Sequence, residues 1–170
     1  MQGEARGRYL GGMETPISTD RAARERDVLD MARAPDAGSF DGLLDRVAAA
    51  LQAGFPQYTG VYLYWLEDPE TLVLRAFRGR PTEHTRIPIG QGICGRAARE
   101  ARTVLVDDVN ADPAYLACSL ETRSEIVVPV MREGRVRGEI DIDSDMPAAF
   151  TGADRVFLER LAALIGDVLE

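Results

Sequence analysis

The chain contains 170 residues, of which 45% are apolar and 28% are charged, and this composition is typical of one globular domain. A formal net charge of -8 excludes a protein that binds duplexes mainly through phosphate contacts, so we expect no nucleic-acid partner. Two cysteines, Cys94 and Cys118, and one histidine, His84, are too few for a disulfide-stapled scaffold or a Cys/His-rich zinc module.

The sequence contains no segment with the pattern of a signal peptide or a membrane span. Residues 1–20 are polar and glycine-rich, and no apolar run approaches the ~20 residues that cross a bilayer. We therefore expect a cytoplasmic protein with no membrane partner, in a compartment that keeps thiols reduced. In that setting the two cysteines serve either packing or chemistry.

Apolar spacing and capping residues predict helices near both ends of the chain. An N-cap within residues 18–20 begins a helix that runs to about Met31, and apolar residues at three- and four-residue intervals predict a second helix over 40–53. Thr151-x-x-Asp154 has the pattern of a capping box and begins a closing helix. A shorter helix is expected over 93–101.

Between these helices, β-branched and aromatic residues predict a series of strands. The expected strands are 58–66, 71–78, 86–89, 103–106, 125–131 and 136–143. Because the strands mostly follow one another and the long helices lie at the ends, this order predicts an α+β fold with an antiparallel sheet. We expect a polar leader over 1–17 and a single domain over 18–170, with N-terminal helices over 18–54, a sheet core over 55–148 and a C-terminal helix over 151–169.

The last two strands carry acidic residues in an alternating pattern. Side chains alternate along a strand, so one face of 136–143 carries an apolar set and the other an acidic set. The apolar set is Val136, Ile140 and Ile142, and the acidic set is Glu139, Asp141 and Asp143. On the preceding strand, Ile126, Val128 and Val130 form an apolar face, with Glu125 on the opposite one.

The two apolar faces lie together only in one register. Ile126 must pair with Ile142, which places Glu125 opposite Asp143 and Val127 opposite Asp141. A three-residue or bulged turn around 133–135 gives this register, whereas a simple two-residue turn does not. The register gathers Glu125, Asp141 and Asp143 on one sheet face.

Two interpretations of these carboxylates remain open. They form a solvated strand face, or they point into a covered space, which the continuously apolar run 126–130 favours. Carboxylates in a covered space need protonation or a cationic partner such as a ligand ammonium group, Mg²⁺ or Ca²⁺. A zinc site made from His84, Cys94 and Cys118 is not expected, because their spacing matches no common zinc pattern.

Four segments together resemble one protein family. They are Arg86-Ile-Pro-Ile-Gly-Gln-Gly-Ile-Cys94-Gly, Ala117-Cys118, Ser124-Glu125-Ile-Val-Val-Pro and Gly138-x-x-Asp141-Ile-Asp143-Ser144. The sequence from about Phe55 to Val168 resembles the free methionine-(R)-sulfoxide reductases, which are single GAF domains. The resemblance implies a GAF-like α+β fold, with a central antiparallel β-sheet, helices packed on one face and a ligand pocket on the other.

The resemblance also implies an oxidoreductase reaction on free methionine sulfoxide. Cys118 would attack the sulfoxide sulfur, and Cys94 would resolve the sulfenic acid to a disulfide that thioredoxin or a similar thiol reduces. Glu125, Asp141 and Asp143 would hold the substrate ammonium and the sulfoxide oxygen. The family implies a homodimer, and no cofactor or metal is expected.

Two positions depart from the family pattern. The family commonly has a further cysteine ten residues before Cys94, where this chain has His84, and a tryptophan beside the pocket, for which we expect Tyr58 as the aromatic wall. Because the resolving route then depends on Cys94 or an external thiol, a second interpretation stays open. In that interpretation the chain is a GAF module that binds or senses a small ligand without turnover.

Overall fold

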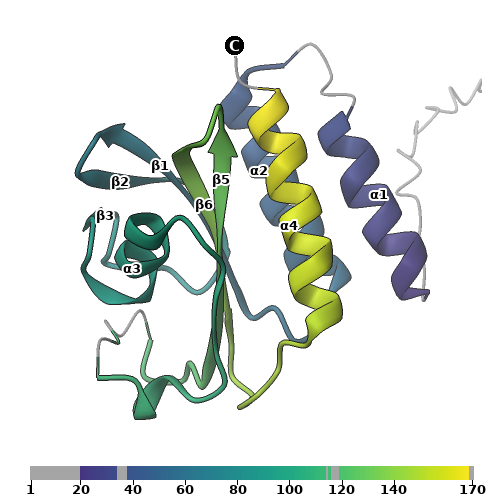
Figure 1. The fold of residues 1–170 in the computed structure, drawn as a ribbon. Helices are drawn as coiled ribbons and strands as arrows, with labels where there is room; N and C mark the ends of the chain where they lie inside the picture. Colours follow the sequence, from purple (N-terminus) through teal and green to yellow (C-terminus); the bar gives the residue numbers. More distant parts are fainter. Residues whose placement is uncertain (1–19, 34–37, 114, 116–118, 169–170) are drawn as a thin grey trace, which may run out of the picture.

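An antiparallel β-sheet forms the centre of the molecule (Figure 1). The computed structural model describes residues 20–33, 38–113, 115 and 119–168, and in these ranges six strands form one sheet of order β3-β2-β1-β6-β5-β4. The strands are β1 (Gly60–Asp68), β2 (Thr71–Gly79), β3 (Arg86–Pro88), β4 (Val104–Val106), β5 (Ser124–Arg132) and β6 (Arg135–Ser144). The predicted α+β fold with an antiparallel sheet is confirmed, including the order of its elements.

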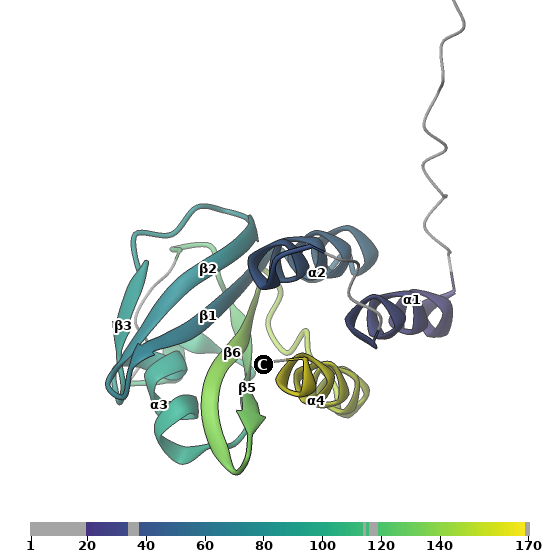
Figure 2. The same ribbon diagram turned by 90° about the horizontal axis from the view of Figure 1, so that it is seen from above.

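Long helices cover one face of the sheet. α2 (Phe40–Gly54) packs on β1 and β2, and α4 (Gly152–Asp167) packs mainly on β5. α1 (Arg21–Arg33) lies outside these two and contacts both, as the view from above shows (Figure 2). The opposite face carries α3 (Gly92–Glu100), with the short 3₁₀ helix η1 (Val109–Ala111) following β4.

Local sequence explains where the two sheet-covering helices begin. The Ser39 side chain accepts a hydrogen bond from the Gly42 amide at 3.2 Å, which satisfies one free N–H group at the start of α2. At the start of α4, Thr151 and Asp154 form a capping box, as the sequence predicted. Each helix then turns its apolar stripe toward the sheet.

The sheet separates two apolar clusters. The cluster on the side of the long helices is larger and includes Leu44, Leu51, Ile140, Ile142 and Phe157, none of which is more than 3% exposed. The cluster on the side of α3 is smaller and mixes apolar residues with tyrosines. Its members include Tyr62, Tyr64, Ile93, Cys94 and Val127.

The predicted register of β5 and β6 is confirmed. Ile126 pairs with Ile142, Glu125 with Asp143 and Val127 with Asp141. The chain reverses through a tight turn at Glu133 and Gly134, both with positive φ, and a bulge then shifts the pairing between Val130 and Met131.

The bulge corrects one expectation from the alternation pattern. Val136 was expected on the face of Ile140 and Ile142, but it packs against the cluster on the α3 side. The extra residue at the bulge, Arg137, reverses the alternation, so residues before it point to the opposite face. The predicted division into a leader and one domain stays a prediction, because residues 1–19 lie outside the described ranges.

Candidate functional site

Four carboxylates lie together on the α3 side of the sheet. Glu139, Asp141 and Asp143 alternate along β6, and Glu125 lies across from Asp143 on β5. None of the four is more than 2% exposed. The sequence therefore predicted their common face correctly, and the structure excludes the solvated-face interpretation.

Cys94 reaches these carboxylates from helix α3. The short helix predicted over 93–101 is confirmed as α3, and Cys94 lies in its first turn. Gly95 makes this placement possible, because a Cβ atom there would lie 2.6 Å from the carbonyl oxygen of Pro88. The Cys94 thiol, 4% exposed, donates a hydrogen bond to Oδ2 of Asp141 at 3.2 Å.

Burial makes these carboxylates difficult to ionise. The pKa of Glu125, Glu139 and Asp141 lies well above the usual carboxyl range, first because of burial and then because of neighbouring carboxylates. Burial raises the pKa of Asp143 to about 7, although a hydrogen bond from Thr122 and the charge of Arg80 lower it. The cluster thus contains carboxylic acids that keep a proton near neutral pH.

Several oxygen atoms of the cluster lack hydrogen-bond partners within the described part of the chain. These are Oε2 of Glu125, both carboxyl oxygens of Glu139, Oδ1 of Asp141 and Oδ1 of Asp143. The second oxygen of Asp143 accepts a hydrogen bond from Thr122 Oγ1 at 3.2 Å. Because unpaired buried oxygens are costly, this face suits a ligand that brings a positive charge and hydrogen-bond donors.

The expectation that Tyr58 forms an aromatic wall beside the carboxylates is wrong. Its side chain lies on the side of the long helices, stacks on Phe55 at 4.8 Å between ring centroids, and donates to Oδ1 of Asp154 at 2.7 Å. The aromatic residues of β1 on the carboxylate face are Tyr62, which pairs with Asp141 across β1 and β6, and Tyr64, which pairs with Glu139. Side-chain alternation along β1, combined with its pairing to β6, was the signal that could have placed Tyr62 on this face.

Two other predicted positions have different outcomes. Cys118 lies outside the described residues, so its role stays a prediction. His84 lies in the connection from β2 to β3, where its backbone carbonyl accepts a hydrogen bond from Tyr64 Oη at 2.8 Å. Arg96 of α3 forms an ion pair with Asp112 at 2.7 Å, which connects the residue that follows η1 to the helix of Cys94.

The three predicted carboxylates and Cys94 therefore come together, and the sequence analysis missed two of their neighbours. Glu139 was placed on the acidic face but not included in the cluster, although its alternation with Asp141 was sufficient to include it. Thr122 contacts Asp143 from a connecting segment, and no periodic pattern points to it.

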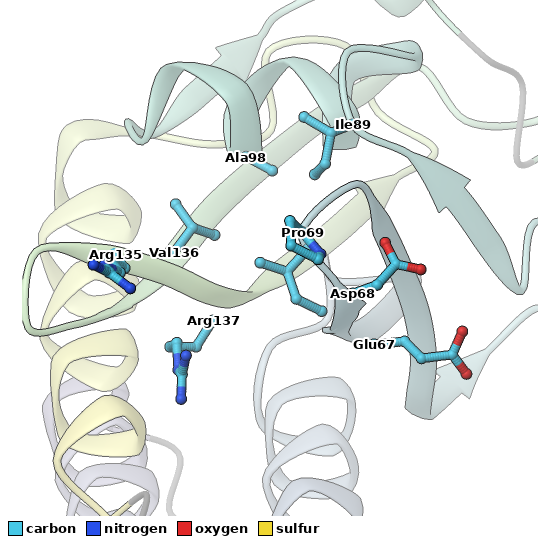
Figure 3. Close-up of a pocket in the computed structure, with 9 residues that line it drawn as sticks. Glu67, Asp68, Pro69, Ile89, Ala98, Arg135, Val136 and Arg137 are labelled. Carbon is cyan, nitrogen blue, oxygen red and sulfur yellow. The ribbon is translucent and has the colours of Figure 1, made fainter.

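A separate pocket of about 560 Å³ lies between the β1–β2 turn and the start of β6 (Figure 3). Its polar lining is Glu67, Asp68, Arg135 and Arg137, with no thiol among the described residues that line it. Because Glu67 already forms an ion pair with Arg86, and none of the buried carboxylates lines the pocket, we place the candidate site at the carboxylate face instead.

Within the described residues, no helix has both the length and the apolar character needed to cross a bilayer.

Comparison with known proteins shows similarity over most of the chain. The profile of the GAF domain family matches residues 37–170. The free methionine-R-sulfoxide reductase of Escherichia coli is 34% identical over 131 residues, which are 77% of this chain and 78% of that protein.

Two further similarities point in the same direction. The free methionine-R-sulfoxide reductase of Saccharomyces cerevisiae is 41% identical over 109 residues, or 64% of this chain and 60% of that protein. The X-ray structure of the free methionine-R-sulfoxide reductase from Neisseria meningitidis in complex with its substrate superposes with a TM-score of 0.80. Its sequence identity is 37%, over 88% of this chain and 90% of that chain.

Proposed function

Because this chain belongs to the GAF domain family, and within it to the free methionine-R-sulfoxide reductases, we propose that it reduces free methionine-R-sulfoxide to methionine. The observation that carries this proposal is the group of buried carboxylates with unpaired oxygens beside the Cys94 thiol. The similarity to a reductase solved with its substrate supports it further.

The carboxylates suit the two polar ends of this substrate. An ionised carboxylate attracts the ammonium group, and a protonated one donates a hydrogen bond to the sulfoxide oxygen. When buried carboxylates interact, one can stay protonated while another is ionised. Here the raised pKa values of Glu125, Asp141 and Asp143 favour such a mixed state. In this proposal one carboxylic acid protonates the oxygen as the S–O bond breaks.

Cys118 then acts as the nucleophile. Its thiolate attacks the sulfoxide sulfur and forms an S–S bond. As the protonated oxygen moves to the cysteine sulfur, the S–O bond of the substrate and this S–S bond break, and methionine leaves with Cys118 as a sulfenic acid. Cysteine is oxidised by two electrons and the sulfoxide is reduced by two. The Cys94 thiol condenses with the sulfenic acid, which forms a disulfide and releases water, and a thioredoxin-type dithiol reduces that disulfide.

Methionine release from each stereoisomer of free methionine sulfoxide tests the reaction. With dithiothreitol as reductant, we expect release from the R form, at least tenfold slower release from the S form, and no release by Cys118→Ser. Cys94→Ser retains a single turnover but loses turnover driven by thioredoxin. Release from the R form by Cys118→Ser at the rate of the unmodified protein would contradict the proposal.

A paired substitution separates the carboxylates from a general effect of charge. Asp143→Asn raises the KM for the sulfoxide at least tenfold, whereas Asp41→Asn, the same change at an exposed carboxylate on α2, leaves KM within about twofold. Binding of the sulfoxide without any release of methionine would instead support the alternative of a ligand-binding GAF module without turnover.

A further inference from the structure

Three side chains with metal-ligating atoms, one each from a helix and two strands, lie close together on the carboxylate face. Cys94 Sγ from α3, a carboxylate oxygen of Glu125 from β5 and one of Asp141 from β6 all lie within 4.8 Å of one another. The thiol lies 3.2 Å from Oδ2 of Asp141. All three side chains are buried, at 4%, 2% and 0% exposure.

Two oxygen atoms of this group have no partner among the described residues. Oε2 of Glu125 and Oδ1 of Asp141 are buried and accept no hydrogen bond there. The neighbouring carboxyl groups of Glu139 and Asp143 disfavour a negative charge on Glu125, whereas Arg96 favours it. A cation at the centre of the three donors would compensate for the lost hydration of the two carboxylates.

The donor set distinguishes between cations. Carboxylates alone favour hard cations such as Mg²⁺ and Ca²⁺, but a thiolate ligand favours Zn²⁺. Ligand atoms around a tetrahedral Zn²⁺ ion are about 3.5 Å apart, given bonds of about 2.3 Å to sulfur and about 2.1 Å to oxygen. Side-chain shifts of about 1 Å would therefore form three protein ligands, and water would occupy the fourth position.

We propose that Cys94, Glu125 and Asp141 form a reversible Zn²⁺ site. On binding, Zn²⁺ displaces the thiol proton of Cys94 and the protons held by Glu125 and Asp141; these protons are released to solvent, and no electrons are transferred. Because the same carboxylates hold the substrate in the proposed reaction, Zn²⁺ competes with the sulfoxide, and this part of the inference rests on the proposed function. The metal ion then acts as an inhibitor and not as a cofactor.

Cobalt(II) titration of the Cys118→Ser protein tests metal binding without any use of activity. The chain has two cysteines, so this variant leaves Cys94 as its sole thiol, and a thiolate–Co²⁺ charge-transfer band then reports on Cys94. We expect one Co²⁺ ion per chain, displaced by an equimolar amount of Zn²⁺ and unaffected by millimolar Mg²⁺. Absence of the band, or displacement by Mg²⁺, would overturn the proposal.

Substitutions of the ligands and of their neighbours complete the test. In the Cys118→Ser background, Cys94→Ser removes the band, and Glu125→Gln or Asp141→Asn weakens Zn²⁺ binding at least tenfold. The matched control Glu139→Gln, which changes a buried carboxylate outside the ligand set, weakens it less than threefold. An equal loss in all three carboxylate variants would show a diffuse electrostatic effect and overturn the site. Circular dichroism confirms that each variant folds.

The site and the proposed function fail in different ways. If the unmodified protein releases methionine but the Cys118→Ser protein shows no Co²⁺ band, the metal site is wrong and the reductase stands. If the band forms but no methionine is released under any reducing condition, the reductase is wrong and the site stands. When both hold, Zn²⁺ raises the apparent KM for the sulfoxide and leaves kcat unchanged.

Discussion

Buried carboxylates on the two faces of the sheet differ in their hydrogen-bond partners. On the side of the long helices, Asp154 is 1% exposed and accepts hydrogen bonds from the Thr151 amide at 2.8 Å and from Tyr58 Oη at 2.7 Å. Arg21 forms an ion pair with the same carboxylate at 3.1 Å. On the α3 side, Glu125, Asp141 and Asp143 are equally buried, yet each has an oxygen without a partner in the described residues.

This difference appears in the pKa values. Burial raises the pKa of Asp154, but the hydrogen bonds that its carboxylate accepts from Thr151 and Tyr58 outweigh this effect, so its pKa is lowered. On the other face, burial dominates and the pKa of each carboxyl is raised. A satisfied buried carboxylate stabilises the fold, whereas an unsatisfied cluster destabilises it and is characteristic of a binding or catalytic site.

The largest expected effect is on the pH dependence of stability. Asp143 has a folded pKa of about 7, so the free energy of unfolding falls as pH rises from about 4, its unfolded value, and levels off above the folded pKa. Asp143→Asn, measured by urea unfolding in EDTA, removes up to about 4 kcal/mol of this fall. An unchanged pH profile would show that Asp143 ionises normally.

Asp154 gives the opposite sign. Its lowered pKa contributes stability that is present above about pH 4 and is lost as pH falls through the folded value. Asp154→Ala removes the capping box and leaves the buried Tyr58 hydroxyl without its acceptor, so we expect a loss of about 3 kcal/mol at neutral pH. Tyr58→Phe, which removes one hydrogen bond, costs about 1 kcal/mol. Urea unfolding measures both losses, and an equal loss of unfolding free energy in Asp154→Ala and Tyr58→Phe would show that the capping box contributes nothing.

Glu139 allows a test in which removal of a buried group stabilises the fold. The side chain is 0% exposed and its pKa is raised by burial, so Glu139→Met is expected to raise the free energy of unfolding by about 1–2 kcal/mol. Glu70→Gln, at an exposed turn position, changes it by less than about 0.5 kcal/mol. Urea unfolding of both variants checks the difference, and destabilisation by Glu139→Met would indicate a structural role.

The smallest expected effect concerns the ion pair of Arg96 and Asp112. Because its side chains are partly exposed, at 24% and 12%, a double-mutant cycle with Arg96→Met and Asp112→Asn should give a coupling energy of about 1 kcal/mol. The same pair ties α3 to Asp112, which directly follows η1. We therefore expect either variant to slow the proposed formation of a disulfide between Cys94 and Cys118. The rate is measured as the loss of free thiols after one turnover. An unchanged rate would separate the pair from the reaction.

Alternation along the strands was sufficient to predict the most specific feature of the site. Pairing of the apolar faces fixed Ile126 opposite Ile142, and with it the position of Glu125 beside Asp143. The bulge at Arg137 could not be located in this way, because a bulge changes the alternation only locally and several positions give the same register. Val136 was misplaced for this reason.

Contacts between distant elements were beyond the reach of the sequence patterns. Tyr58 precedes β1, so strand alternation does not determine its side, which is instead fixed by its hydrogen bond to Asp154 of α4. The contact of Cys94 with Asp141 likewise depends on how α3 packs against the sheet. The family resemblance indicated that Cys94 and Asp141 belong to one site, but not that a hydrogen bond joins them.

Calorimetric titration of the Cys118→Ser protein with free methionine-R-sulfoxide tests most directly whether the unsatisfied carboxylate face exists for this ligand. We predict one bound molecule per chain, a preference for the R over the S form, and at least tenfold weaker binding after Asp143→Asn. Tyr58→Phe, on the opposite face, should leave the affinity within about twofold. No binding, or equal weakening by the two substitutions, would contradict the account.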